Sequence, residues 1–85
     1  MSIVQVDKNL FGTFLRTCRA KNGWSLCDVK QRTGINPSYL NRLERGKRRN
    51  PSVILVQSLA VAYSVQVTTL IDLLLLDKGE EQIKE

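Results

Sequence analysis

The chain has 85 residues, which is enough for one small domain with a modest core. Its hydrophobic fraction of 42% is normal for a globular chain and excludes a disordered one, while a net charge of +5 and a pI near 9.6 favour nucleic acid, or less often a membrane surface, as partner. There is no histidine, and Cys18 and Cys27 alone cannot complete a metal shell, so no metal and no cofactor are expected.

The chain begins with a segment, 1–8, that is predicted to be flexible and that lacks the basic start and apolar run of a signal peptide. A first helix is expected over about 9–22, because apolar residues recur there at three- and four-residue spacing. These residues are Leu10, Phe11, Phe14, Leu15 and Cys18. One face of the helix is therefore apolar, and Cys18 is interpreted as a small core residue. Free thiols suit a reducing, cytoplasmic setting.

A second helix is expected to open at Ser25, whose hydroxyl can cap it, with Asp28 three residues later completing a variant of the capping box. It lasts only two turns before Gly34. Glycine also follows the first and third helical segments, as Gly23 and Gly46, where a left-handed residue ends a helix. The glycines therefore predict several short helices in series.

A third helix is expected to start with Asn36 as cap and Pro37 at the first helical position, where the missing N–H costs nothing. Leu40 and Leu43 would face inward. Only the segment 34–36 separates this helix from the second one. Two short helices joined by three residues, one of them glycine, predict a helix-turn-helix.

A fourth helix is expected from near Ser52 to Tyr63, and a fifth from Val67 to about Leu76. The fourth is predicted to bury Val53, Val56, Leu59, Ala60 and Tyr63. The uncharged run over 51–71 has nearly the length of a bilayer span, but polar side chains interrupt it. We therefore predict no membrane span but a compact all-α, five-helix domain over 9–76, followed by a polar tail over 77–85.

Positive charge is concentrated in the middle of the chain. From Arg16 to Arg49 there are ten basic residues and two acids, a net charge of +8. The densest part holds Arg42, Arg45, Lys47, Arg48 and Arg49. On composition alone this could be a solvated surface, but the charge falls across a helix-turn-helix, where a phosphate ladder would run.

Several short motifs occur together in one order. They are Phe14-Leu15-Arg16 with Arg19, Trp24-Ser25-Leu26, Thr33-Gly34-Ile35, Ser38-Tyr39-Leu40, Leu43-Glu44-Arg45-Gly46 and Asn50-Pro51-Ser52. In this combination the chain resembles the DNA-binding domain of the Cro and phage-repressor helix-turn-helix regulators, the XRE family, over about 10–76. The resemblance implies the phage-repressor type of five-helix fold.

The resemblance also implies roles for individual residues, with the helix over 37–45 as the recognition helix. The expected base-contacting residues are Asn36, Pro37, Ser38, Tyr39, Asn41 and Arg42. The expected phosphate-contacting residues are Ser25, Leu26, Lys47, Arg48, Arg49 and Asn50. A structural ion pair between Arg19 and Glu44 is expected to join the first helix to the end of the third.

The sequence departs from the family pattern at three positions. Lys30 stands where alanine is usual between the second and third helices, and Leu26 stands where some relatives have a phosphate-binding glutamine. Ser64 stands near the end of the fourth helix in place of glycine, so we expect an unfavourable left-handed backbone there. Trp24 is interpreted as a packing residue at the corner between the first two helices.

The fifth helix carries leucines on more than one face, which exceeds what a small domain can bury. The plain alternative is that the tail folds back over them. We favour a homodimer interface, since regulators of this kind read two-fold related half-sites. The expected interface residues are Leu70, Leu73, Leu74 and Leu76.

These observations predict a sequence-specific regulator of transcription that binds double-stranded DNA as a homodimer and represses by occupying an operator. Restriction–modification controllers, mobile-element immunity repressors and antitoxins all fit, and no effector domain is expected after the fifth helix. The alternative is a protein–protein adaptor that uses the leucine-rich fifth helix. We expect no enzyme, because no nucleophile with a base and no phosphate-cradling glycine motif is present.

Overall fold

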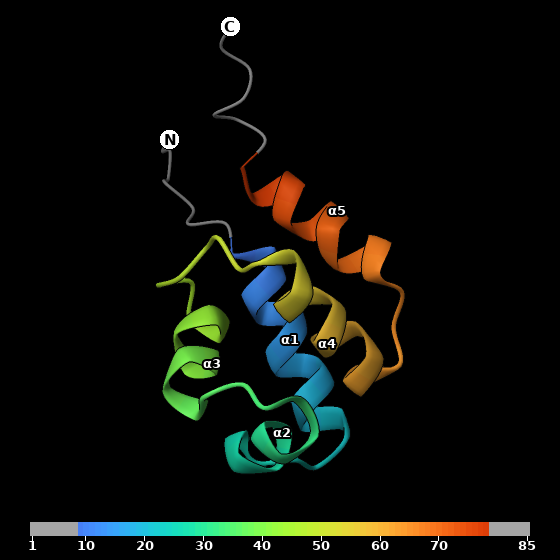
Figure 1. The fold of residues 1–85 in the computed structure, drawn as a ribbon. Helices are drawn as coiled ribbons and strands as arrows, with labels where there is room; N and C mark the ends of the chain where they lie inside the picture. The colour runs from blue at the N-terminus through green and yellow to red at the C-terminus, as the bar shows by residue number, and fades with distance from the viewer. Residues whose placement is uncertain (1–8, 79–85) are drawn as a thin grey trace, which may run out of the picture.

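The computed structural model describes residues 9–78, so the predicted flexible segment 1–8 and the tail beyond 78 lie outside the described residues. Residues 9–78 form five α-helices and no strand, which confirms the predicted all-α fold (Figure 1). The helices are α1 (Leu10–Lys21), α2 (Leu26–Thr33), α3 (Pro37–Glu44), α4 (Val53–Tyr63) and α5 (Val67–Asp77). None of these helices is long and apolar enough to cross a membrane.

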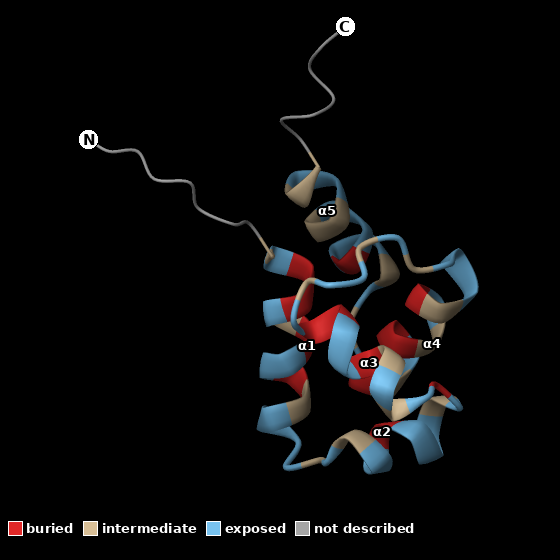
Figure 2. Ribbon diagram, turned by 90° about the vertical axis from the view of Figure 1, so that its left-hand side faces the viewer, coloured by how far each residue is buried: buried red, intermediate tan, exposed pale blue. Residues whose placement is uncertain are grey.

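Helix α1 runs through the middle of the domain and packs against α3 on one side and α5 on another, while α2 contacts α3 and α4 (Figure 1). The buried side chains point to a common centre (Figure 2). The largest fully buried ones are Leu15, Leu40, Leu43, Leu59, Leu70 and Val29. Burying a leucine or valine side chain stabilises the fold by about 1.5–3 kcal/mol, so these six residues supply much of the driving force.

Local signals set the starts of three helices, as predicted. Ser25 forms the capping box with Asp28: its Oγ accepts from the Asp28 N–H at 3.0 Å, and its own N–H donates to Asp28 Oδ2 at 2.8 Å. Asn36 Oδ1 accepts from the Ser38 N–H at 2.7 Å, and Ser52 Oγ accepts from the Leu55 N–H at 3.1 Å.

Left-handed residues end helices where the glycines indicated. Gly34 has a φ of 80° and turns the chain between α2 and α3, and Gly46 has a φ of 78° after α3. The predicted left-handed backbone at Ser64 is also present, with a φ of 57°. A residue with a Cβ is strained in this region, so Ser64 is a place where this chain sacrifices stability.

Two predictions about the last two helices are wrong. Val53 is not buried but is 76% exposed, because every residue from 53 to 56 is apolar and only Val56 faces the core. The folded domain also continues past residue 76. Helix α5 includes Asp77, whose carboxylate accepts hydrogen bonds from the Leu10 N–H at 2.7 Å and the Phe11 N–H at 3.1 Å.

Asp77 therefore caps the amino end of α1, a task that the side chain of Asn9, the N-cap residue, does not perform. The contact joins residues that are 67 positions apart in the chain. Next to it, the Lys78 ammonium donates to Asn50 Oδ1. The end of α5 is thus attached to the start of α1 and to the segment between α3 and α4.

Candidate nucleic-acid interface

The outer side of α3 carries one continuous polar stripe. Ser38, Asn41, Arg42 and Arg45 are all exposed and follow one another at the spacing of a single helix face. Leu40, Leu43 and Glu44 are buried on the opposite side. Figure 2 looks onto α3 and shows exposed residues toward the viewer and buried ones toward the core. Three of the six predicted base-contacting residues share this stripe.

The other predicted base-contacting residues are placed differently. Asn36 Oδ1 already accepts from two N–H groups, those of Ser38 and Tyr39, so only its amide nitrogen remains for an outside partner. Pro37 is half-buried at the first position of α3. Tyr39 is also half-buried, and the Arg48 guanidinium lies over its ring, 5.4 Å from the centroid. The ring thus supports a cation, an arrangement that the sequence gave no means to foresee.

The predicted ion pair between Arg19 and Glu44 is present. Arg19 Nε donates to Glu44 Oε2 at 2.7 Å and Nη2 donates to Oε1 at 2.9 Å, while Nη1 donates to the Trp24 carbonyl at 3.1 Å. The Glu44 side chain is only 3% exposed. The hydrogen bonds to Glu44 raise the pKa of Arg19 further above its ordinary value. A two-pronged charged contact of this kind fixes both distance and angle between α1 and the end of α3.

Two further contacts hold the same junction. Asn9 Nδ2 donates to the Glu44 carbonyl at 3.0 Å. Gly12 lies so close to α3 that a Cβ there would be 2.4 Å from the Leu43 carbonyl oxygen and 2.6 Å from that of Glu44. The recognition helix is therefore set against α1 by backbone proximity as well as by charge.

The amino end of α2 offers fewer side-chain contacts than predicted. The Ser25 oxygen and N–H are used in the capping box, and Leu26 is half-buried against the core. The Ser25 N–H keeps the Asp28 pKa below its ordinary value, so this carboxylate stays ionised near neutral pH. What remains for a phosphate is the Ser25 hydroxyl hydrogen and the first N–H groups of the helix.

The segment after α3 presents the predicted phosphate-contacting cations. Lys47 and Arg48 are exposed, and Arg49 is half-buried with its Nε donating to the Gly46 carbonyl at 2.9 Å. Asn50 is exposed, but its Oδ1 accepts from Lys78. Gly46 is needed at the start of this segment, because a Cβ would lie 2.9 Å from the Asn9 side chain.

Trp24 packs at the corner between α1 and α2, as predicted. Its ring stacks on Tyr63 with centroids 5.8 Å apart, and the Arg32 guanidinium lies 4.1 Å from the Trp24 centroid. Burial raises the pKa of Tyr63 to about 12, and the nearby Glu44 charge adds to this shift. Lys30 is exposed, so its stem does not fill the α2–α3 contact. Cys18 is buried in the core, as predicted, and Cys27 is an exposed free thiol.

The predicted dimer residues on α5 divide into two groups. Leu70 is 0% exposed and belongs to the core of its own chain, so it cannot contact a second chain. Leu73 and Leu74 are half-buried, and Leu76 is 55% exposed. The sequence did not single out Ile71 and Leu75, although Leu75 is 60% exposed. A run of uninterrupted leucines carries no signal for which of them face outward.

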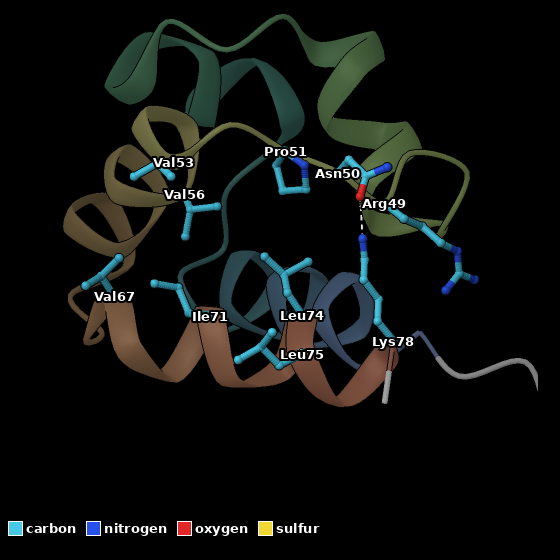
Figure 3. A pocket seen from close by; sticks show the side chains of 10 residues that line it. All are labelled: Arg49, Asn50, Pro51, Val53, Val56, Val67, Ile71, Leu74, Leu75 and Lys78. Carbon is cyan, nitrogen blue, oxygen red and sulfur yellow. Dashed lines mark hydrogen bonds between the residues drawn. The ribbon is translucent and has the colours of Figure 1, made fainter. Parts of the chain in front are cut away.

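An apolar groove of about 300 Å³ lies between α4 and α5 (Figure 3). Its walls are mostly Val53, Val56, Val67, Ile71, Leu74 and Leu75, and Arg49, Asn50, Pro51 and Lys78 close one end. The neighbouring surface adds Ile54, Val61 and Leu76, which are 55–77% exposed. We call this groove and its apolar rim the α4–α5 face. An apolar surface of this extent is typical of a contact with another protein.

These features define a class of protein. Two short helices joined by a glycine turn carry an exposed stripe of amide, hydroxyl and guanidinium groups, and cations flank the stripe. This is the geometry with which a helix-turn-helix protein enters the major groove of a duplex.

Comparison with known proteins agrees. The family described as "Helix-turn-helix domain" matches residues 10–74, and the chain belongs to this family. The uncharacterised HTH-type transcriptional regulator y4dJ of Sinorhizobium fredii is 38% identical over 64 residues, which cover 75% of this chain and 82% of y4dJ. The HTH-type transcriptional regulator SlrR of Bacillus subtilis is 32% identical over 63 residues, which cover 74% of this chain and 41% of SlrR.

A crystal structure of SinR, named as the master regulator for biofilm formation, in complex with DNA is also similar. Its TM-score is 0.68 at 31% identity, and the match covers 73% of this chain and 98% of that one. The predicted resemblance to Cro and phage-repressor regulators is thus confirmed at the level of the family. The named relatives are regulators of transcription and not enzymes. The chain spans only 41–57% of the length of SlrR and SinR from Bacillus subtilis.

Proposed function

We propose that this chain is a sequence-specific regulator of transcription that binds double-stranded DNA through α3. One observation carries the proposal: the exposed stripe Ser38, Asn41 and Arg42 lies on a helix whose position is fixed by the buried Arg19–Glu44 pair. A recognition helix must keep its register in the groove to read bases, and a two-pronged ion pair supplies that rigidity. Membership of a helix-turn-helix family with a DNA-bound relative supports the same conclusion.

The cations on the two sides of Gly46 have different tasks in this proposal. Arg42 lies on the groove-facing stripe, where a guanidinium can grip a guanine edge with two hydrogen bonds and contribute roughly 1–3 kcal/mol of discrimination. Lys47, Arg48 and Arg49 follow the end of the helix and meet phosphates. Arg48 is held over Tyr39, so Tyr39 acts in part by positioning a phosphate contact.

The proposed active species is a homodimer joined through the α4–α5 face, which reads two half-sites about one DNA turn apart. The support is the exposed apolar surface of Ile71, Leu75 and Leu76, which faces no other part of residues 9–78. Leu73 and Leu74 border it, and Leu70 is left out. Repression by occupying an operator follows from tight, specific binding near a promoter, and access to chromosomal DNA places the protein in the cytoplasm.

Selection of bound duplexes from a random DNA pool tests the proposal. We expect a two-fold related consensus whose affinity falls steeply between 50 and 200 mM salt, because several phosphate contacts release counterions. If no duplex is enriched even at low salt, DNA binding is absent. The α4–α5 face would then be the main functional surface, and the protein would be an adaptor for another protein.

Variants of the selected site separate the two groups of cations. Arg42→Ala should remove the preference at one base pair in each half-site. Arg48→Ala should weaken all sequences alike and lower the salt slope by about one unit. If Arg42→Ala weakens every variant site equally, Arg42 is a phosphate anchor, and base reading then rests on Ser38 and Asn41.

A further inference from the structure

A polar hollow of about 140 Å³ lies where α1 meets the end of α3. It is lined by Arg16, Arg19, Asn41, Glu44 and Arg45. Neither Arg16 nor Arg45 is among the predicted DNA contacts, and both are exposed. The hollow brings together side chains from two helices, so its composition could not be derived from either helix alone.

The hollow is cationic. The Glu44 carboxylate is used by Arg19, which donates to both of its oxygens. Within residues 9–78, Arg16 and Arg45 have no hydrogen bond and no acid within ion-pair distance. Two guanidinium groups therefore share a small space with no available negative charge. An anion with several acceptor oxygens would satisfy both, and phosphate has the geometry that guanidinium forks prefer.

The hollow also lies at the correct place for a backbone phosphate. Arg45 follows Ser38 by seven residues, two helical turns, and so lies on the same exposed stripe as Asn41 and Arg42. Helix α3 has 8 residues and is therefore about 12 Å long, close to the width of about 12 Å of the major groove. When the middle of the stripe faces the bases, its carboxyl end reaches the wall of the groove, where the phosphates are.

From this geometry we infer that Arg16 and Arg45 together bind one DNA backbone phosphate, so that α1 contacts the duplex directly. The inference rests on the proposed function, because the ligand is part of the same DNA. The α1–α3 junction holds the two arginines at a constant separation: the Arg19–Glu44 pair and the Gly12 contact fix the helices beside the hollow. The site anchors the end of α3 opposite to its amino-terminal cap and does not read sequence.

The test measures binding of a selected two-half-site duplex as a function of salt for Arg16→Ala, Arg45→Ala and the double variant. Each should weaken binding to all sequences alike and lower the salt slope by about 0.9 per half-site. The double variant should lose little more than either single one, because both arginines hold the same phosphate. Arg16→Lys should recover the slope but only part of the affinity, because an ammonium keeps the charge without the fork.

Arg32→Gln is the matched control. It removes the same charge on the α2–α4 side, where Arg32 lies over Trp24, and should leave the salt slope unchanged. Thermal melts check that the variants fold. If Arg16→Ala is unstable, Arg16→Gln takes its place.

A second measurement replaces single phosphates of the duplex by neutral methylphosphonates. One position in each half-site should weaken the wild type several-fold and have no effect on the double variant. If Arg16→Ala and Arg45→Ala bind like the wild type, or lose affinity with no change in slope, the inference is wrong. Base-selective loss in Arg45→Ala would also overturn it. A wild type that binds no duplex at all would instead contradict the proposed function, and this arm is measured first.

Discussion

Two junctions in this domain are built in opposite ways. The α1–α3 junction is held by directional contacts: the Arg19–Glu44 pair, the Asn9 amide on the Glu44 carbonyl, and the backbone approach at Gly12. The α4–α5 junction is held by apolar packing around Leu59 and Leu70 and leaves an open groove. Directional contacts fix an orientation, whereas apolar packing fixes mainly a volume. The first suits a helix that must read bases, and the second suits a surface that accepts another chain.

The largest effect should come from Gly12→Ala. The new Cβ would lie 2.4–2.6 Å from the Leu43 and Glu44 carbonyl oxygens, which are backbone atoms and cannot rotate away. We expect a loss of about 3 kcal/mol or more in the free energy of unfolding, measured by urea denaturation, because α1 and α3 must separate. Gly23→Ala is the matched control, since nothing lies within 4 Å of its Cβ position and only its φ of 68° opposes the change. It should cost about 1–2 kcal/mol.

A smaller effect is expected from breaking the ion pair. Arg19→Met leaves the Glu44 carboxylate buried without a partner and should cost roughly 3 kcal/mol, while Glu44→Gln should cost less because the amide still accepts one hydrogen bond. The double change Arg19→Met with Glu44→Gln should cost less than the sum of the two. Thermal melts of the four proteins decide. Strict additivity would show that the two side chains do not stabilise one another, and the contrast between the junctions would lose its main support.

An intermediate case is Asp77→Asn, which tests the one directional contact that α5 makes with α1. The carboxylate caps the Leu10 and Phe11 N–H groups, and an amide can replace only part of this. We expect a loss of about 1 kcal/mol, as for other helix caps. Hydrogen exchange at the start of α1 should become faster. Unchanged exchange there would mean that the cap contributes nothing, and that apolar packing alone holds α5.

The smallest effect on stability should come from Leu75→Glu. Its side chain is 60% exposed, so the isolated fold should change by no more than about 0.5 kcal/mol. Leu70→Ala is the contrasting change on the same helix and should cost about 2–5 kcal/mol, because Leu70 is fully buried. A Leu75→Glu protein that unfolds would show that the α4–α5 face is needed by the monomer itself.

Local rules predicted much of the fold. Caps and left-handed residues depend on a few neighbours, which is why Ser25, Asn36, Ser52 and Ser64 were assigned correctly. Orientation in α4 and α5 was harder, because nearly uniform apolar sequence has no polar face to mark the outside. Val53 was therefore placed inside and Leu70 at an interface. Both errors have the same physical cause.

The site was predictable where it depends on a helix face and less so where elements converge. The stripe through Ser38, Asn41 and Arg42 follows from counting along α3. The use of Asn36 as a cap, the Arg48–Tyr39 contact and the Asp77 cap all depend on groups brought together by folding. Spacing along one helix could have added Arg45 to the stripe, but its neighbour Arg16 is visible only once α1 and α3 are packed.

The most direct test of the division between the two junctions is a binding comparison of wild type and Leu75→Glu on two duplexes, one with a single selected half-site and one with a pair. Both proteins should bind the single half-site equally, because α3 and its α1 support are unchanged. On the paired site the wild type should bind at least tenfold more tightly than Leu75→Glu, since only the wild type joins two copies through the α4–α5 face. Equal affinity of the two proteins for the paired site would contradict the account.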